Sequence, residues 1–278
     1  MSSELITHVL NTAASKRAKV LLVSDSSLSY DAIIRIPNRE DKFIIKVKEN
    51  VEDVDKESIT DLAVLARVSN STPLIIGVRY GDEDLLDGVA YKVHGVFAVG
   101  ITTFRKILND EDVVFVKDKG MIKASVKGKL LRRLREERGM SLGDLAKALG
   151  VTRKTVYEYE RGSFEASERT AQALMELFGK EVLERVDLRP RDEELMDEIR
   201  ARERSVDEGI RALLPSFKLY LLMRAHARMA AQSSKESYLV EDRHRISNVV
   251  INVAKVLGVG IAVIEPNKRE VEFLEPAR

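Results

Sequence analysis

Cysteine and tryptophan are absent from the 278 residues of this chain, and aromatic residues make up only 5% of it. Without cysteine the protein can form no disulfide bond, no thiolate metal site and no cysteine nucleophile. Apolar burial and polar pairing must therefore hold the fold together, and this composition fits a reducing cytoplasm.

Long hydrophobic runs are missing as well. The most apolar stretch, residues 249–264, is interrupted by Asn252 and Lys255, and it is shorter than the roughly 20 residues that a bilayer requires. The N-terminus has no basic start followed by an apolar core, so it is not typical of a signal peptide. We therefore expect a cytoplasmic protein without a membrane partner.

The length of the chain predicts two or three compact domains, because domains usually contain about 100–200 residues. Alternating strand and helix patterns indicate an α/β domain at residues 1–110. Its helices are expected at residues 5–18 and 58–68, its strands at 19–23, 32–36, 43–47 and 74–77, and a small hairpin with a helix at 91–108. A hairpin connector is expected to follow at 111–126.

The C-terminal part repeats the order of the N-terminal elements. In the N-terminal part, three segments follow one another at 43–50, 65–68 and 74–76. Similar segments follow in the same order, and with nearly the same spacing, at 229–237, 253–256 and 261–264. This repeat predicts a second, smaller α/β domain at 212–278, with chance similarity of two strand-helix-strand units as the alternative. Residues 188–211 are dense in charges of both signs and are expected to form an exposed helix or linker.

Positive charge is concentrated in the middle of the chain. Residues 123–162 contain 11 Lys and Arg against 5 Asp and Glu, whereas the rest of the chain contains 35 against 40. Such an excess attracts a phosphate backbone and releases its condensed counterions, although a solvated helix face would also explain it.

The same segment has the spacing of three short helices. Leu130, Leu131 and Leu134 share one face of a first helix, which Gly139 is placed to end. Ser141 is a suitable N-cap for a second helix at 142–149. A third helix at 153–161 follows the turn at Gly150 and the N-cap Thr152. Its Val156 and Tyr159 are expected to face inward.

This stretch resembles the Cro/C1-type helix-turn-helix family, also called the Xre family, in residues 134–142, 145–146, 149–152 and 159–162. The resemblance implies an all-α DNA-binding domain at residues 127–187 whose third helix enters the major groove. It also implies an ion pair between Arg135 and Glu160. The DNA-binding residues expected from this interpretation are Lys129, Ser141, Thr152, Arg153, Lys154, Thr155, Tyr157, Glu158 and Arg161.

The whole chain is similar to an archaeal group of helix-turn-helix regulators, and its N-terminal part resembles, more faintly, the restriction-endonuclease-like fold of Holliday-junction resolvases. Such nucleases hold a metal with two carboxylates and place a lysine beside them. Asp31 and Lys46 match two of these positions, but Ile44 stands where a glutamate is needed. In the second copy, Lys218 and Ser233 lie near the corresponding places. We therefore interpret both α/β domains as degenerate, inactive scaffolds.

Other catalytic patterns are missing from the sequence. His8, His94, His226 and His244 lie far apart and lack metal-ligand spacing, so no metal or cofactor is expected. Residues 243–245, Arg-His-Arg, form a basic cluster that is either a contact for DNA or a partner, or a solvated helix start.

The predicted function is sequence-specific binding of double-stranded DNA by a homodimeric, non-enzymatic transcription regulator. The flanking α/β domains would supply dimer contacts and leave room for an effector or a protein partner. The alternative is a structure-specific nucleic-acid enzyme of the resolvase or nuclease type, or its catalytically inactive accessory subunit.

Overall fold

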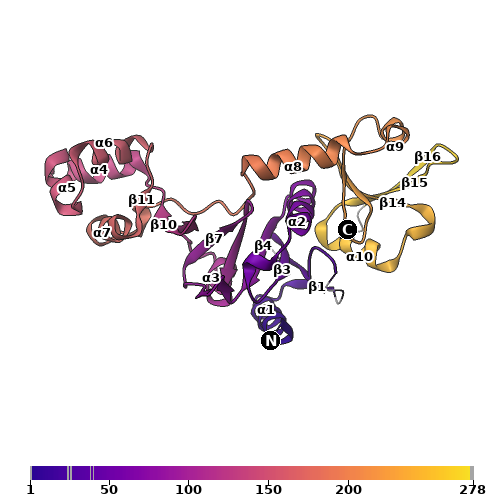
Figure 1. Ribbon diagram of the computed structural model, residues 1–278, viewed down its shortest axis with the longest axis horizontal. Helices are drawn as coiled ribbons and strands as arrows, with labels where there is room; N and C mark the ends of the chain where they lie inside the picture. The colour runs from indigo at the N-terminus through magenta and orange to yellow at the C-terminus, as the bar shows by residue number, and fades with distance from the viewer. Residues whose placement is uncertain (1, 24, 26, 38, 40, 276–278) are drawn as a thin grey trace. The chain divides into compact units, whose positions relative to one another are not determined.

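A computed structural model describes residues 2–23, 25, 27–37, 39 and 41–275 of the protein (Figure 1). The chain divides into two compact units. The first unit contains Met1–Asp84, Val93–Ile101 and Leu188–Arg278, and the second contains Leu85–Lys92 and Thr102–Asp187. The N-terminal and C-terminal α/β parts therefore belong to one unit, and the central helices to the other.

The N-terminal half of the first unit is a sheet with the strand order β1-β2-β3-β4-β8. The elements are α1 (Ser2–Ala14), β1 (Lys19–Leu22), β2 (Ala32–Arg35), β3 (Lys42–Val47), η1 (Val51–Asp53), α2 (Lys56–Ser69), β4 (Thr72–Gly77), the small hairpin β5 (Arg79–Tyr80) and β6 (Glu83–Asp84), and β8 (Val96–Gly100). The pairs β1–β2 and β2–β3 are antiparallel, whereas β3–β4 and β4–β8 are parallel. Ile44, Ile45 and Ile75 are completely buried, as is typical of strands covered on both faces.

The C-terminal half has the strand order β12-β13-β14-β15-β16, and its first four strands repeat the arrangement of β1 to β4. The fifth strand differs, because β15–β16 is antiparallel whereas β4–β8 is parallel. The elements are α8 (Glu193–Arg204), α9 (Glu208–Leu213), β12 (Lys218–Leu221), β13 (Met229–Gln232), β14 (Ser237–Asp242), η3 (Arg243–Arg245), α10 (Asn248–Leu257), β15 (Gly260–Glu265) and β16 (Glu270–Leu274). Its first three strands are antiparallel, β14–β15 is parallel, and a helix again connects the two parallel strands. The expected recurrence of elements is therefore present in the backbone.

The register of the repeat differs from the one expected. Ala32 pairs with Ile45 across β2 and β3, and Met229 pairs with Val240 across β13 and β14. Residues 229–232 thus correspond to β2, and not to β3 as the sequence comparison assumed. The prediction that Lys218 and Ser233 lie near the nuclease-like positions is wrong. When β13 is aligned with β2 and β14 with β3, Arg228 takes the place of Asp31 and Glu241 takes the place of Lys46.

The charged segment after residue 188 is also more ordered than an exposed linker. Helix α8 buries Leu195 and Ile199, which lie one turn apart and face α2 and β12. The high density of charge hid this short apolar stripe in the sequence.

The two halves of the first unit cover one another. Helix α2 lies against β13 and β14 of the other half, and α10 lies against β1 and β2. The Lys42 ammonium donates to the carbonyl of Ser69 at the end of α2 and, at 2.6 Å, to that of Leu257 at the end of α10. A lysine at this place complements the negative ends of both helix dipoles.

Asp61 on α2 makes a second set of polar contacts between the two halves. Its carboxylate is fully buried and accepts hydrogen bonds from the amides of Met223 at 3.1 Å and Arg224 at 2.7 Å. It also accepts one from the Ser29 hydroxyl at 2.8 Å, and the Arg202 guanidinium lies 3.6 Å away. Burial raises the pKa of Asp61, against the opposing effect of these donors. Asp61 is therefore a buried polar centre of the interface between the halves.

The second unit combines a small sheet with a helical module. Its elements are β7 (Val89–Val93), α3 (Ile101–Leu108), β9 (Phe115–Asp118), β10 (Met121–Ala124), α4 (Gly128–Glu137), α5 (Leu142–Leu149), α6 (Arg153–Arg161), β11 (Ala166–Ser167), α7 (Glu168–Phe178) and η2 (Lys180–Val182). Leu131, Leu145, Val156 and Leu174, one from each of α4, α5, α6 and α7, are completely buried together. Within the described part of the chain, none of the helices has the length and apolar character needed to cross a bilayer.

Candidate nucleic-acid interface

Helices α5 and α6 are joined by a short turn that caps both of them. The Ser141 hydroxyl accepts the Asp144 amide at 3.1 Å, and the Asp144 carboxylate accepts the Ser141 amide at 2.8 Å. This capping box begins α5, and Gly150, with φ of 66°, ends it. Thr152 begins α6 by accepting the Thr155 amide at 3.1 Å. The sequence analysis identified both N-caps but missed Asp144, which the Ser-x-x-Asp spacing signals.

A buried ion pair fixes α6 against α4. Arg135 Nε donates to Glu160 Oε1 at 2.5 Å and Arg135 Nη2 donates to Glu160 Oε2 at 3.2 Å. The third donor, Nη1, reaches the Met140 carbonyl at 2.7 Å. Only 9% of the Arg135 side chain and 7% of the Glu160 side chain are exposed. The hydrogen bond to Glu160 is the main cause of the raised pKa of Arg135, so the guanidinium stays charged.

The outer face of α6 carries four of the nine expected DNA-binding side chains. Arg153, Lys154, Tyr157 and Arg161 are exposed, and their spacing places them on one side of the helix. Tyr157 is 47% exposed, and the Arg161 guanidinium lies 5.6 Å from the centre of its ring. Val156 and Tyr159 are buried, which fixes the rotation of the helix.

The remaining expected residues lie around this face in different environments. Lys129 and Ser141 are exposed, on α4 and at the start of α5, and Glu158 is half-buried. The hydroxyls of Thr152 and Thr155 lie 2.8 Å apart and hydrogen-bond to each other. These two threonines are therefore engaged in capping the helix, which limits what they can offer to a ligand.

The nuclease-like position of the N-terminal half holds an ion pair. Asp31 Oδ1 lies 3.2 Å from Lys46 Nζ, and Asp31 Oδ2 accepts the Val47 amide at 2.6 Å. Lys46 also donates to the Leu28 carbonyl at 2.7 Å. Ile44 is completely buried. Each oxygen of the single carboxylate at this place therefore already has a partner, a lysine or an amide.

At the corresponding position of the C-terminal half, an arginine replaces the aspartate. Arg228 stands at the place of Asp31, and its amide donates to Glu241 at 3.0 Å. Its guanidinium donates to Asp242 at 3.1 Å. Across the described residues, no group of three or more histidine and carboxylate side chains is arranged to hold a metal ion.

Comparison with known families supports both parts of this description. Residues 2–113 match the PD-(D/E)XK superfamily domain, and residues 131–184 match the Helix-turn-helix family. The second match covers α4 to α7 and contains the Arg135–Glu160 pair and the exposed face of α6.

Relatives are found among archaea. A protein of Saccharolobus islandicus named "Putative HTH-type transcriptional regulatory protein" is 30% identical over 225 residues, which cover 81% of this chain and 68% of that protein. The chain belongs to this family of HTH-type transcriptional regulatory proteins. A relative of the same name from Saccharolobus solfataricus is 29% identical over 225 residues, with the same coverage of both chains.

A third HTH-type regulator, from Pyrobaculum aerophilum, is 29% identical over 203 residues, which cover 73% of this chain and 80% of that protein. No solved structure matches the chain significantly. The recognition of an archaeal regulator with a Cro/C1-type helix-turn-helix is confirmed, and so is the nuclease-like character of the N-terminal α/β part.

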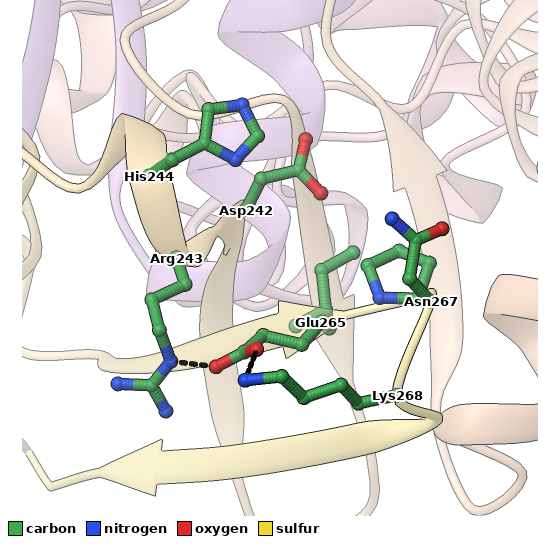
Figure 2. Close-up of a pocket in the computed structure, with 8 residues that line it drawn as sticks. Asp242, Arg243, His244, Glu265, Asn267 and Lys268 are labelled. Atoms are coloured by element: carbon green, nitrogen blue, oxygen red, sulfur yellow. Dashed lines mark ion pairs between the residues drawn. The ribbon is translucent and has the colours of Figure 1, made fainter.

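The basic cluster of the regulator at residues 243–245 borders a pocket of about 430 Å³ at the carboxyl ends of β14 and β15. Figure 2 shows Arg243 and Lys268 directed toward Glu265 from opposite sides. Arg243 also pairs with Glu272 at 2.5 Å, and Arg245 lies 3.7 Å from Glu241. Carboxylates thus neutralise both arginines of this cluster, which favours a structural role over contact with a phosphate backbone.

Proposed function

We propose that this regulator binds double-stranded DNA in a sequence-specific manner as a homodimer, with α6 in the major groove. The observation that carries the proposal is the exposed face of α6, where Arg153, Lys154 and Tyr157 project from a helix held by the buried Arg135–Glu160 pair. A rigid helix with exposed basic and aromatic side chains suits reading of base edges.

The side chains divide into two roles in this proposal. Arg153 donates two parallel hydrogen bonds to a guanine, and Lys154, Tyr157 and Glu158 contact neighbouring bases. Lys129, Ser141 and Arg161 contact phosphates and fix the register of the module on the duplex. Thr152 and Thr155 act mainly by shaping the N-terminus of α6, because their hydroxyls bond to each other.

Selection of bound duplexes from a random-sequence library tests the proposal directly. Because one module reads one half-site, the selected duplexes are expected to contain inverted repeats whose half-sites lie about one helical turn apart. The absence of any enriched sequence would contradict specific binding, and single unpaired half-sites would contradict the homodimer.

Arg153 and Lys129 are expected to have different effects on binding. Arg153→Ala should lower affinity for the selected site by about 1–3 kcal/mol and leave affinity for a scrambled duplex nearly unchanged. Lys129→Ala should weaken binding to both duplexes alike and reduce the slope of log affinity against log salt by about one unit. Titrations at several salt concentrations measure both effects. Equal losses from Arg153→Ala on both duplexes would mean that α6 does not read sequence.

For the flanking parts we propose an α/β domain at residues 1–110, a connector at 111–126, the helix-turn-helix domain at 127–187, a charged segment at 188–211 and a second α/β domain at 212–278. Both α/β parts act as scaffolds that provide dimer contacts and room for an effector or partner. Ile44 in place of the glutamate and Arg228 in place of Asp31 support loss of nuclease chemistry, because neither half keeps both carboxylates at the positions that would hold a metal.

A nuclease or its accessory subunit is the second candidate, and the PD-(D/E)XK match favours it. Incubation of the protein with Mg²⁺ or Mn²⁺ and linear or branched duplexes is expected to give binding without cleavage. Asp31→Ala serves as the control. Cleavage by the unchanged protein that this substitution abolishes would establish the second candidate.

A further inference from the structure

Gly143 in the first turn of α5 lies directly beneath the side chain of Arg153. A Cβ atom built on Gly143 would lie 2.8 Å from Arg153 Nε, 2.9 Å from Nη2 and 3.1 Å from Cζ. These distances are shorter than ordinary van der Waals contacts. The guanidinium of Arg153 therefore occupies space that exists only because residue 143 has no side chain.

This contact places the guanidinium of an otherwise exposed side chain against the backbone of α5. An arginine at the start of an exposed helix samples many rotamers, and fixing it on binding costs free energy. Here the guanidinium extends from α6 back across the N-terminal turn of α5. Asp144 faces the same side. The hydrogen bonds with Ser141 are the main cause of the lowered pKa of Asp144, and the positive charge of Arg153 lowers it further.

We propose that Gly143 is a positioning residue for sequence recognition, because its bare backbone holds the Arg153 guanidinium in one orientation before DNA is bound. The inference rests on the proposed function, in which Arg153 reads a base. In this proposal α5 contributes to specificity indirectly: Gly143 contacts Arg153, and Arg153 contacts the base.

The substitution that tests this inference is expected to change stability and DNA affinity in opposite directions, which separates a positioning role from a structural one. In Gly143→Ala the new methyl group collides only with the tip of a flexible side chain, so the guanidinium moves and the fold is kept. Alanine also favours the helical conformation more than glycine does. The variant is therefore expected to be at least as thermostable as the wild type and yet to bind its selected site less tightly.

A double-mutant cycle on the full chain measures the effect. The wild type, Gly143→Ala, Arg153→Ala and the double variant are titrated with the duplex selected by the wild type and with a scrambled duplex of equal length. Gly143→Ala is expected to reduce affinity for the selected duplex about three- to tenfold, which is the cost of ordering one long side chain. In the Arg153→Ala background the same substitution should have no effect.

Ala148→Gly is the matched control, because it also changes α5 by one methyl group at an exposed position. It is expected to lower the melting temperature without changing the ratio of the two affinities. The ¹⁵N-bound Nε proton of Arg153 provides a readout that needs no DNA, since its resonance should shift in Gly143→Ala and not in Ala148→Gly.

An equal loss of affinity from Gly143→Ala with and without Arg153 would overturn the inference, as would an unshifted Nε resonance. Failure of the proposed function gives a different result. In that case the wild type itself would not distinguish a selected duplex from a scrambled one, while the Nε resonance would still report the contact with Gly143.

Discussion

Replacing Asp61 with alanine is expected to lower the free energy of unfolding of the α/β unit by about 3–5 kcal/mol, the usual cost of leaving a buried charge without its partner. The substitution removes the acceptor for two amides, Met223 and Arg224, and the carboxylate that faces the Arg202 guanidinium. Arg202 Nη1 is buried without a hydrogen bond even with Asp61 present. Denaturant unfolding, followed by circular dichroism, measures the change.

Asp197→Ala provides the control for the loss of one carboxylate. Asp197 lies on α8 in an exposed pair with Arg200 at 3.0 Å, and 74% of its side chain is exposed. Because exposed pairs contribute about 0–1 kcal/mol, this variant should unfold almost like the wild type. Similar unfolding curves for Asp61→Ala and Asp197→Ala would show that the two halves do not depend on the buried carboxylate.

Replacing Glu160 with alanine is expected to destabilise the helix-turn-helix module by a similar amount, about 3–5 kcal/mol. The Arg135 guanidinium would remain buried with the Met140 carbonyl as its main acceptor. Since this pair joins α4 to the end of α6, DNA affinity should fall as well. Thermal unfolding and a binding titration measure the two effects.

Two further variants identify the cause of that loss. Glu137→Ala removes an exposed carboxylate, 3.6 Å from Arg133, and should change neither stability nor affinity. The double variant Arg135→Met with Glu160→Leu removes both charges and should recover much of the stability, because a buried ion pair can be replaced by apolar side chains. An unchanged melting temperature in Glu160→Ala would contradict the role of the pair.

The helix-turn-helix module was predictable because its determinants are local. Ser141, Gly150 and Thr152 cap α5 and α6 through bonds that span at most a few residues, and the apolar spacing sets which faces are buried. The pairing of Arg135 with Glu160, 25 residues apart, followed from a family resemblance rather than from spacing alone. The contact between Gly143 and Arg153 was missed, since no pattern shows which side chain crosses a glycine.

In the α/β unit the outcome was different. The sequence predicted the main strands and helices of the N-terminal half, because alternating apolar patterns and turns are local features. For the C-terminal half it predicted only a strand, a helix and a second strand, where the structure has β12 to β16. It placed Lys218 and Ser233 wrongly, because residues 229–237 were aligned with β3 although β13 corresponds to β2. A shift of one strand leaves the order of elements in a weak repeat almost unchanged, so the sequence does not reveal it. Strand register, which assigns Arg228 and Glu241 to these positions, depends on hydrogen bonds between separate segments.

The sequence by itself thus determined the helix-turn-helix module, its caps and its charge, since these depend on neighbours within a turn or two of the chain. Only the tertiary structure decided how the two α/β halves combine. The carboxylate of Asp61 accepts amides more than 160 residues away, and Lys42 reaches a carbonyl 215 residues away. The free energy of such contacts depends on burial and geometry that the packing of the whole unit creates, so no local pattern in the sequence encodes them.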